Sequence, residues 1–295
     1  MTGGPNVVAL GGGHGLAVTL RAVLPWAGSV TAVVSTADDG GSTGRIRESW
    51  DVPALGDVRR CLATLASVSD PSGVWSRVLE RRFDVGELSG HAVGNLILLA
   101  LIEEVGDLQS ACDEVARATG IPRSRARVVP VTEDTVSLHA RTVDGQVVDG
   151  QVAVTTTERI ESVWVEPEIT AASQVALEAI ARADLVLLGP GSLYTSVLAA
   201  AVVGEVRRAL AATTGRVVYL GNLRADGAET RGYDLGDHIA ALSRHGIHPD
   251  VALADTGRMP VGDPGLAMVE ADLARADGSA HDPERLGAAL ATLVG

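Results

Sequence analysis

The chain contains no lysine, few aromatic residues and two cysteines. All 24 basic residues among the 295 are arginine, which excludes a P-loop lysine, a Schiff base and a lysine general base. One Phe, three Tyr and four Trp are too few for the aromatic platforms that bind single-stranded nucleic acid. Cys61 and Cys112 form neither a disulfide framework nor a metal-ligand pattern.

Charge and hydropathy limit the partners further. The net charge of -13 would repel the phosphates of nucleic acid, so no nucleic-acid partner is expected. The best candidate for a membrane span, the apolar run 96–102, ends at Glu103 and Glu104 and falls short of the ~18 residues that a span requires. Residues 1–8 have no basic segment before an apolar run, so no signal peptide is expected. The sequence predicts a cytoplasmic protein.

Short β-branched runs alternate with amphipathic stretches along most of the chain. This pattern predicts an α/β, Rossmann-like fold in which helices cover both faces of a mostly parallel sheet. Residues 127–165 differ, because they alternate at period two around the turns 144–145 and 149–150, which predicts a small antiparallel β insertion. We interpret residues 1–295 as a single domain that contains this insertion.

The strands of the main sheet place the candidate binding loops. We expect strands at 6–10, 29–36, 184–189, 216–220, 251–254 and 266–270. We expect helices at 56–68, 74–83, 91–105, 108–118, 171–183, 235–245 and 283–293. Open α/β sheets bind ligands beyond the carboxyl ends of their strands, so the loops that follow these strands form the candidate site.

The first such loop is rich in glycine. It consists of Gly11, Gly12, Gly13, His14 and Gly15. Glycine allows the backbone to approach a phosphate, and the following helix offers free N–H groups at its N-terminus. The dinucleotide fingerprint would need glycine at position 16, where Leu16 stands. A tight strand-to-helix turn without a ligand is the alternative.

The second loop joins two acids to a run of small residues. Its candidate residues are Asp38, Asp39, Gly41, Ser42, Thr43 and Arg45. Adjacent carboxylates repel unless a ribose diol, a metal ion or nearby arginines offset the charge. Asp38 falls about 20 residues after the glycine turn, where Rossmann proteins place a ribose-binding acid. The glycines and hydroxyls that follow favour a second anion nest, and an acidic turn with capping roles is the alternative.

Two helix starts carry further polar residues. Asp57 either caps its helix or faces a ligand, and the adjacent Arg59 and Arg60 either face solvent or bind phosphate. Asn95 precedes an apolar helix, so we expect its side chain to hydrogen-bond a ligand or a neighbouring loop. His91 is interpreted first as a capping residue.

Two later loops complete the candidate site. The loop after residues 184–189 carries Gly189, Gly191, Ser192, Tyr194 and Thr195. It has the size of a phosphate-binding turn, in which Tyr194 either stacks on a ring or packs structurally. The next loop carries a polar set suited to a base or a sugar, namely Asn222, Glu229, Thr230, Arg231 and Tyr233. Nucleophile-elbow, CxxC and HExxH motifs are missing, and no residue is singled out as catalytic.

Five motifs in order resemble the gluconeogenesis factor family, whose relatives include 2-phospho-L-lactate transferase. They are GGGHGL, TADDGGSTGRIRE, PALGDVRRCLATLA, GHAVGNLILLAL and GPGSLYTS, and the resemblance covers residues 7 to about 294. It implies a cytoplasmic Rossmann-like protein that binds UDP-sugars, notably UDP-N-acetylglucosamine. It also implies a regulator needed for cell shape and envelope precursor supply during gluconeogenic growth, rather than a turnover enzyme.

The resemblance also implies roles for individual residues and partners. The turns 11–15 and 189–192 would hold the diphosphate, Asp38, Asp39 and Ser42 would line the same cleft, and Tyr194 and Asn222 would contact nucleotide or sugar. It implies a homodimer or higher oligomer and a protein partner in amino-sugar or cell-wall synthesis. This chain departs from the family pattern at three places, which are His14, Ala199–Ala200 and Ala280.

A metal-dependent transferase is the alternative function. Such an enzyme would act on a nucleotide diphosphate conjugate, as 2-phospho-L-lactate transferase does. It would need Mg²⁺ with the nucleotide, and Asp38, Asp39 and Asp57 are the candidate ligands. The residues themselves indicate no other cofactor.

Overall fold

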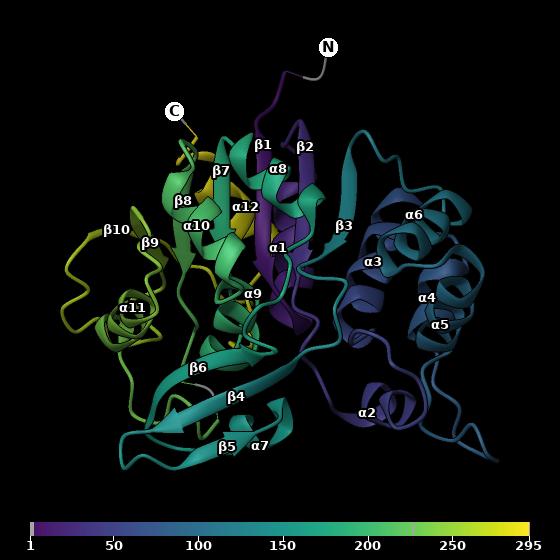
Figure 1. The fold of residues 1–295 in the computed structure, drawn as a ribbon. Coiled ribbons are helices and arrows are strands. Elements are labelled where there is room, and N and C mark those ends of the chain that lie inside the picture. Colours follow the sequence, from purple (N-terminus) through teal and green to yellow (C-terminus); the bar gives the residue numbers. More distant parts are fainter. Residues whose placement is uncertain (1–2, 226, 295) are drawn as a thin grey trace.

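A parallel sheet of seven strands runs through the part of the chain described by the computed structural model, residues 3–225 and 227–294 (Figure 1). In spatial order the strands are β10 (Ala267–Glu270), β9 (Val251–Ala254), β8 (Arg216–Leu220), β7 (Leu185–Leu188), β1 (Asn6–Gly11), β2 (Ser29–Val34) and β3 (Ala126–Pro130). Neighbouring strands pair in parallel throughout. The predicted α/β, mostly parallel fold is therefore confirmed.

The central strands are buried on both faces. All four residues of β7 are buried, and β1 is buried from Val7 to Gly11. A strand covered on both faces needs apolar residues at successive positions, as the runs VVAL and LVLL provide. Val7 pairs with both Val30 and Leu185, so β1 lies at the middle of the sheet with its neighbours in fixed register.

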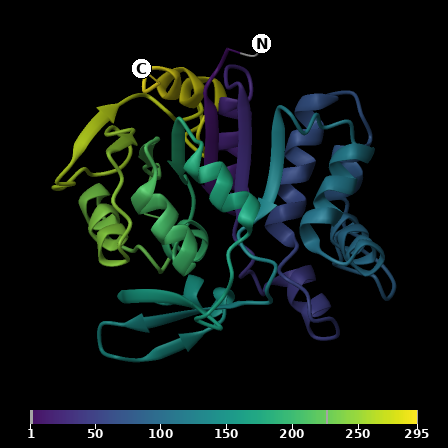
Figure 2. The same cartoon turned by 45° about the horizontal axis from the view of Figure 1, so that its top comes forward.

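Helices cover both faces of the sheet. One hydrophobic cluster contains α1 (Gly13–Val23), α3 (Gly56–Ser69), α5 (Val93–Val105), α6 (Leu108–Ala118) and α12 (Pro283–Ala291), with α4 (Trp75–Glu80) beside them. The other cluster contains α8 (Gln174–Ala181), η1 (Leu193–Leu198), α9 (Ala199–Ala201), α10 (Gly204–Ala212) and α11 (Leu235–Arg244). Figure 2 shows α12 beside the N-terminal end of the chain, and both termini lie at the edge where the strands begin.

A second, antiparallel sheet lies beyond the carboxyl ends of the main strands (Figure 1). It contains β5 (Val147–Asp149), β4 (Ser137–Thr142) and β6 (Ile160–Glu166). The predicted insertion began at 127, but residues 126–130 form β3 of the main sheet. Periodicity cannot separate these two sheets, because both contain apolar residues at alternate positions.

Two short helices stand where the sequence predicted other structure. Gln151–Thr155, expected in the β insertion, forms α7, which follows Gly150 at φ +92°. Gly41–Arg47, expected as a loop, forms α2. Ser42, Thr43 and Ile46 of α2 are buried, so tertiary packing stabilises a glycine-rich helix whose intrinsic propensity is low.

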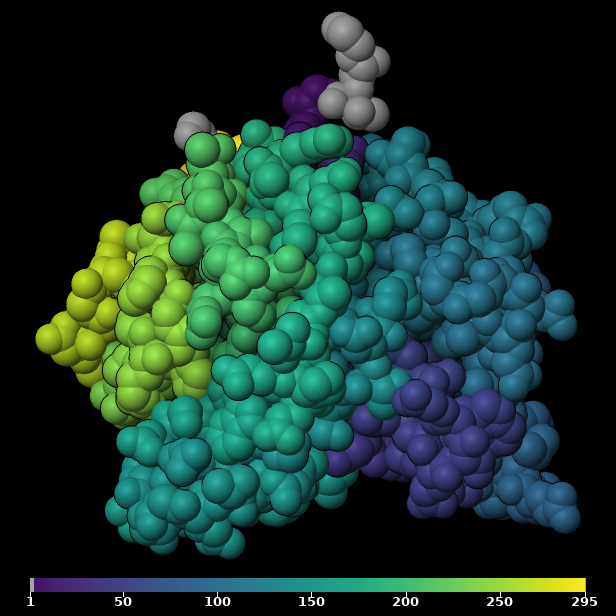
Figure 3. All heavy atoms as spheres, viewed as in Figure 1, coloured from purple at the N-terminus to yellow at the C-terminus, as the bar shows by residue number. Residues whose placement is uncertain are grey.

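No helix within the described residues is long and apolar enough to cross a membrane. The space-filling view shows α2 and the antiparallel sheet next to each other along the lower edge (Figure 3). They flank the carboxyl ends of β1 and β2, where the candidate loops lie.

Candidate functional site

The order of the strands creates a crevice between β1 and β7. From β1 the chain continues to β2 and β3 on one side, whereas β8, β9 and β10 follow β7 on the other. The loops after β1 and β7 therefore diverge, which is the position where open α/β sheets bind ligands.

The two glycine turns at this crevice touch each other. Thr19 Oγ1 donates to the carbonyl of Gly189 at 3.0 Å. A Cβ atom at Gly15 would lie 1.9 Å from the carbonyl oxygen of Pro190, so only glycine permits this approach. The first and third predicted loops thus form one continuous backbone surface.

A central cleft of about 260 Å³ opens beside these turns. Its lining residues are Gly13, His14, Asp38, Gly40, Ser42, Thr43, Gly56, Asp57, Arg59, Arg60, Arg82, Asn95, Gln151 and Ser196. The cleft brings together nine residues that the sequence analysis considered, namely Gly13, His14, Asp38, Ser42, Thr43, Asp57, Arg59, Arg60 and Asn95. These residues come from α1, the β2–α2 loop, α2, α3 and α5. The other wall of the cleft is contributed by α7 and η1.

A side pocket of about 190 Å³ lies on the other side of His14. Its lining residues are His14, Gly15, Val18, Pro190, Gly191, Asn222, Leu223, Arg224, Ser279, Ala280 and His281. Asn222 Oδ1 accepts the N–H of Gly191 at 3.0 Å, and its Nδ2 donates to the Gly191 carbonyl at 3.0 Å. Asn222 therefore fixes the β7 turn with both of its polar atoms.

The adjacent acids Asp38 and Asp39 face different surroundings. Asp38 lines the central cleft and accepts the N–H of Gly40 at 3.1 Å. Asp39 does not line it; its Oδ1 accepts the N–H of Val152 at 2.9 Å and so binds α7. The expectation that the two acids share one cleft holds for Asp38 alone.

Asp57 is the acid that accompanies Asp38 in the cleft. It accepts a hydrogen bond from the N–H of Gly13 at the start of α1 and pairs with Arg60 Nη1 at 3.0 Å. Burial raises the pKa of Asp57, and the negative charge of Asp38 adds to this effect, whereas Arg60 opposes it. Burial is also the main cause that raises the pKa of Asp38. Two carboxyls in one cleft are costly to ionise together.

Arginines supply the positive charge of the cleft. Arg59 is buried and pairs with Glu80 at 2.7 Å, and its Nε has no hydrogen-bond partner among the described residues. Arg82 donates from Nη1 to the carbonyl of Gly90 at 2.9 Å. The Arg60 charge is the main cause that lowers the pKa of His14, followed by burial, so His14 is neutral at physiological pH.

Ser42 joins α2 to the start of α5. Its Oγ accepts the N–H of Ala92 at 3.3 Å and Nδ2 of Asn95 at 3.2 Å, and it lies 3.2 Å from Nδ1 of His91. Since both lone pairs of Oγ are used, its hydroxyl proton points to Nδ1, which requires a neutral His91 protonated at Nε2. Burial and Arg45 lower the pKa of His91, which agrees with this form.

Asn95 carries an unused acceptor beside the cleft. The side chain is 1% exposed, and its Oδ1 has no partner among residues 3–225 and 227–294. A buried carbonyl without a partner costs about 1–3 kcal/mol. A ligand donor in the cleft would satisfy this oxygen.

The turn after β7 is occupied by a side chain of the protein. The Glu229 carboxylate accepts hydrogen bonds from Thr195 Oγ1 at 2.9 Å and from the N–H of Tyr194 at 3.4 Å. The backbone N–H of Leu193 donates a further hydrogen bond to it. Burial raises the pKa of Glu229 to about 7. Sequence reasoning grouped Glu229 with base-reading residues and missed this role, because the pairing spans 34 residues.

Tyr194 and Thr195 lie inside the protein rather than in a cavity. Tyr194 is fully buried, and its hydroxyl donates to the Ile160 carbonyl at 3.1 Å and contacts Tyr233 at 3.1 Å. Its ring packs edge-on against His245. We therefore leave Tyr194 out of the ligand contacts, and its structural alternative fits this placement.

The other sequence candidates surround the site without lining the cleft. Arg45 donates from Nη1 to the Ser89 carbonyl at 2.9 Å. A Cβ atom at Gly12 would lie 2.2 Å from Asp57 Oδ2. The remaining candidates outside the central cleft and the side pocket are Gly11, Gly41, Gly189, Ser192, Thr230 and Arg231, of which Arg231 pairs with Glu158 at 2.7 Å.

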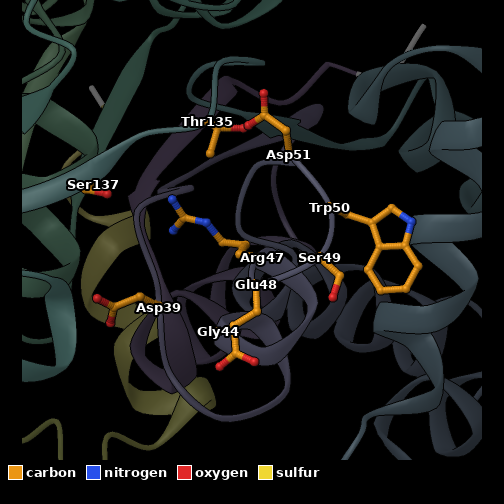
Figure 4. Close-up of a pocket in the computed structure, with 9 residues that line it drawn as sticks. All are labelled: Asp39, Gly44, Arg47, Glu48, Ser49, Trp50, Asp51, Thr135 and Ser137. Carbon is orange, nitrogen blue, oxygen red and sulfur yellow. The ribbon is translucent and has the colours of Figure 1, made fainter.

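A wider outer groove of about 550 Å³ lies between α2 and the antiparallel sheet. Figure 4 shows Arg47 extending between the two walls, with Asp39 and Trp50 on different sides. Arg47 donates to the carbonyls of Asp38 and Val136 at 3.2 and 2.8 Å. The groove thus contains one sequence candidate, Asp39, and Arg47 connects it to the back of the cleft.

Within the described residues, no three or more His, Cys, Asp or Glu side chains are grouped so that they could hold a metal ion. Asp38 and Asp57 alone remain as neighbouring carboxyls in the cleft. Mg²⁺ in proteins is commonly bound by one or two carboxylates together with phosphates of the substrate and water. The two carboxyls therefore fit a magnesium ion that arrives with a phosphate ligand, but they form no complete protein site.

Known proteins resemble this chain over most of its length. Residues 7–285 match the CofD family, described as 2-phospho-L-lactate transferase CofD. The gluconeogenesis factor of Halalkalibacterium halodurans is 38% identical over 251 residues, which cover 83% of this chain and 76% of the relative. The gluconeogenesis factor of Bacillus subtilis is 36% identical over 243 residues, 82% of this chain and 75% of the relative.

A solved structure has the same fold. The crystal structure of a UPF0052-family protein from Bacillus halodurans superposes with a TM-score of 0.89 at 32% identity. The match covers 97% of this chain and 99% of the other. The family match, the curated relatives and the shared fold agree over nearly the whole chain: it belongs to the CofD family and, within it, to the gluconeogenesis factors.

Proposed function

We propose that this protein binds a UDP-sugar, UDP-N-acetylglucosamine, at the crevice between β1 and β7 and acts as a regulator in the cytoplasm. The observation that carries the proposal is the meeting of two glycine turns at a polar cleft. Gly15 lies against Pro190 there, and His14 separates the central cleft from the side pocket. An elongated ligand with a diphosphate in its middle would reach from one cavity to the other past His14, which lines both.

The charges of the cleft support a diphosphate near the start of α1. Arg59, Arg60 and Arg82 line one part of the cleft, and the N-terminus of α1 adds its positive dipole. The unused Oδ1 of Asn95 would accept a hydroxyl or amide N–H of the sugar. The nucleoside would then lie in the side pocket, whose wall includes Asn222 and Leu223.

The transferase alternative is favoured by one observation. Asp38 and Asp57 face the same cleft, and with a phosphate they would hold Mg²⁺, which would act as a Lewis acid and neutralise charge on the leaving nucleoside phosphate. Gly56 supports this arrangement, because a Cβ atom there would lie 3.0 Å from Asp38 Oδ2. In this alternative the arginines bind and orient the diphosphate.

Regulation requires a partner that responds to the bound ligand. We propose a protein of amino-sugar or cell-wall synthesis as this partner, with the chain acting as a homodimer or higher oligomer. Cell shape and envelope precursor supply during gluconeogenic growth are the processes it would affect.

Calorimetric titration with UDP-N-acetylglucosamine, GDP and NAD, each with and without Mg²⁺, tests the proposal. We expect UDP-N-acetylglucosamine to bind one site per chain and to be recovered intact. The variant Asn95→Leu should weaken binding, whereas the exposed Arg182→Gln should not. A preference for GDP, or breakdown of the ligand only with Mg²⁺, would replace the regulator with the transferase. Binding of NAD alone would contradict both.

A further inference from the structure

A second basic cavity, which we call the arginine groove, lies outside the cleft between α1, α3 and α4. It has a volume of about 310 Å³, which is at the lower end of small-molecule sites. Arg21, Arg60 and Arg77 line it, together with the hydroxyl residues Thr64, Ser67 and Ser76.

Helical spacing builds the groove from three elements. On α1, residues 14, 17 and 21 lie on one face, and on α3 residues 60, 63, 64 and 67 do so. Ala17 and Ala63 leave space between the two helices, and α4 closes the groove with Arg77 and Glu80.

The groove carries positive charge on an acidic protein. The net charge of the chain is -13, yet three arginines meet here. Arg21 forms no hydrogen bond or ion pair within the described residues. The one acid of the groove, Glu80, is paired with Arg59 at 2.7 Å. Arg60 is paired with Asp57 at 3.0 Å, and Arg77 donates to the carbonyl of Gly73 at 3.1 Å, so Arg21 and Arg77 are the arginines of the groove without a carboxylate partner among the described residues. Guanidinium groups of this kind beside hydroxyls are suited to a phosphate group and the hydroxyls of its carrier.

We propose that the arginine groove is a second ligand site, which binds a phosphorylated small molecule of the sugar phosphate class. Arg21 and Arg77 bind its phosphate, and Thr64 and Ser76 face its hydroxyls. The site is separate from the cleft between β1 and β7, but the two share His14 and Arg60. Occupancy of the groove therefore acts on the cleft through two common residues, and any coupling must be reciprocal.

Calorimetric titration with glucose 6-phosphate tests the site, with glucose as the uncharged control. We expect one equivalent of glucose 6-phosphate to bind and glucose not to bind. Arg21→Gln and Arg77→Gln should each lower the affinity about tenfold, as the loss of one charged hydrogen bond predicts. Arg182→Gln and Arg208→Gln are matched controls, because these exposed arginines lie directly after α8 and on α10; they should leave the affinity unchanged.

Thr43→Val separates the groove from the cleft, because Thr43 lines the cleft alone. We expect this variant to bind glucose 6-phosphate as the unmodified chain does. Sensitivity to Thr43→Val without sensitivity to Arg21→Gln would place the ligand in the cleft and overturn the proposal. Absence of binding up to millimolar concentration would also overturn it. Neither result depends on whether UDP-N-acetylglucosamine binds, so the two proposals fail separately.

Discussion

Replacing Glu229 by glutamine should remove a pH dependence from the stability of the protein. Burial raises the pKa of Glu229 to about 7 in the folded state, whereas the ordinary value, which applies to the unfolded chain, is 4.5. A carboxyl whose pKa is higher in the folded state takes up a proton on folding, and this proton uptake stabilises the folded state. The stabilisation has its full value at a pH below the unfolded pKa. That contribution is lost as the pH rises from about 4.5 to about 7.

The size of the effect follows from the two pKa values. One pH unit corresponds to 1.36 kcal/mol, so ionised Glu229 costs the folded state about 3 kcal/mol above pH 7. Glutamine stays neutral and keeps an oxygen for Thr195 or the N–H of Tyr194. Because about 1 kcal/mol of this cost is already present at pH 5, Glu229→Gln should gain about 2.5 kcal/mol relative to the unmodified protein between pH 5 and pH 8.

Urea unfolding at several pH values measures this difference. Glu178→Gln is the control, since Glu178 is exposed and pairs with Arg182 only at 4.0 Å. Its curve of unfolding free energy against pH should run parallel to that of the unmodified chain. If the Glu229→Gln curve is also parallel, the carboxyl is not buried as an ionisable group and the reasoning is refuted.

Three further variants test the cleft. Gly15→Ala would place a Cβ atom 1.9 Å from the carbonyl oxygen of Pro190, so it should lower the unfolding free energy by about 1–3 kcal/mol. Thermal denaturation measures this loss, with Gly204→Ala as the control. The Cβ of that variant would make only an ordinary contact, so it should not destabilise the protein. Ser42→Ala should cost about 1–3 kcal/mol in urea unfolding, because two donors lose their buried acceptor. Without metal, affinity for UDP-N-acetylglucosamine should rise as the pH falls toward the raised pKa of Asp57. Asp57→Asn should bind about fivefold more tightly near pH 8 and should show a weaker pH dependence, to which Asp38 still contributes; unchanged calorimetric curves would contradict that role.

The parallel sheet could be predicted from the sequence because its signals are local. The apolar runs of β1 and β7 and the glycine turns after them identify strands and loops without tertiary information. Since parallel strands end at one edge, the turns were also expected to lie together. The contact between Gly15 and Pro190 agrees with this prediction.

The sequence could not predict that the side chains of Asp38 and Asp39 point to different surroundings. Asp38 and Asp39 are neighbours in sequence, but Asp39 hydrogen-bonds the N–H of Val152, 113 residues away. That contact exists because residues 151–155 form α7 against this loop, and the period-two pattern predicted a strand there. Because residues 151–155 were assigned to a strand, the long-range hydrogen bond of Asp39 to this segment could not be predicted.

The structural role of Glu229 could not be predicted from the sequence for a similar reason. The turn after β7 has the composition of a phosphate nest, and composition cannot show that a carboxylate of the same chain fills it. Thr195 and the backbone of residues 193–195 bind Glu229 instead of a ligand. The β1 turn and the arginines of α3 therefore carry more of the proposed diphosphate site than the sequence indicated.

A crystal structure of the protein with UDP-N-acetylglucosamine tests the central proposal most directly. We expect the diphosphate to lie beside the start of α1, within hydrogen-bond distance of Arg60, with the sugar near Asn95 and the nucleoside toward Asn222. A ligand bound in the outer groove at Trp50, or a chain that binds no UDP-sugar under saturating conditions, would contradict the account.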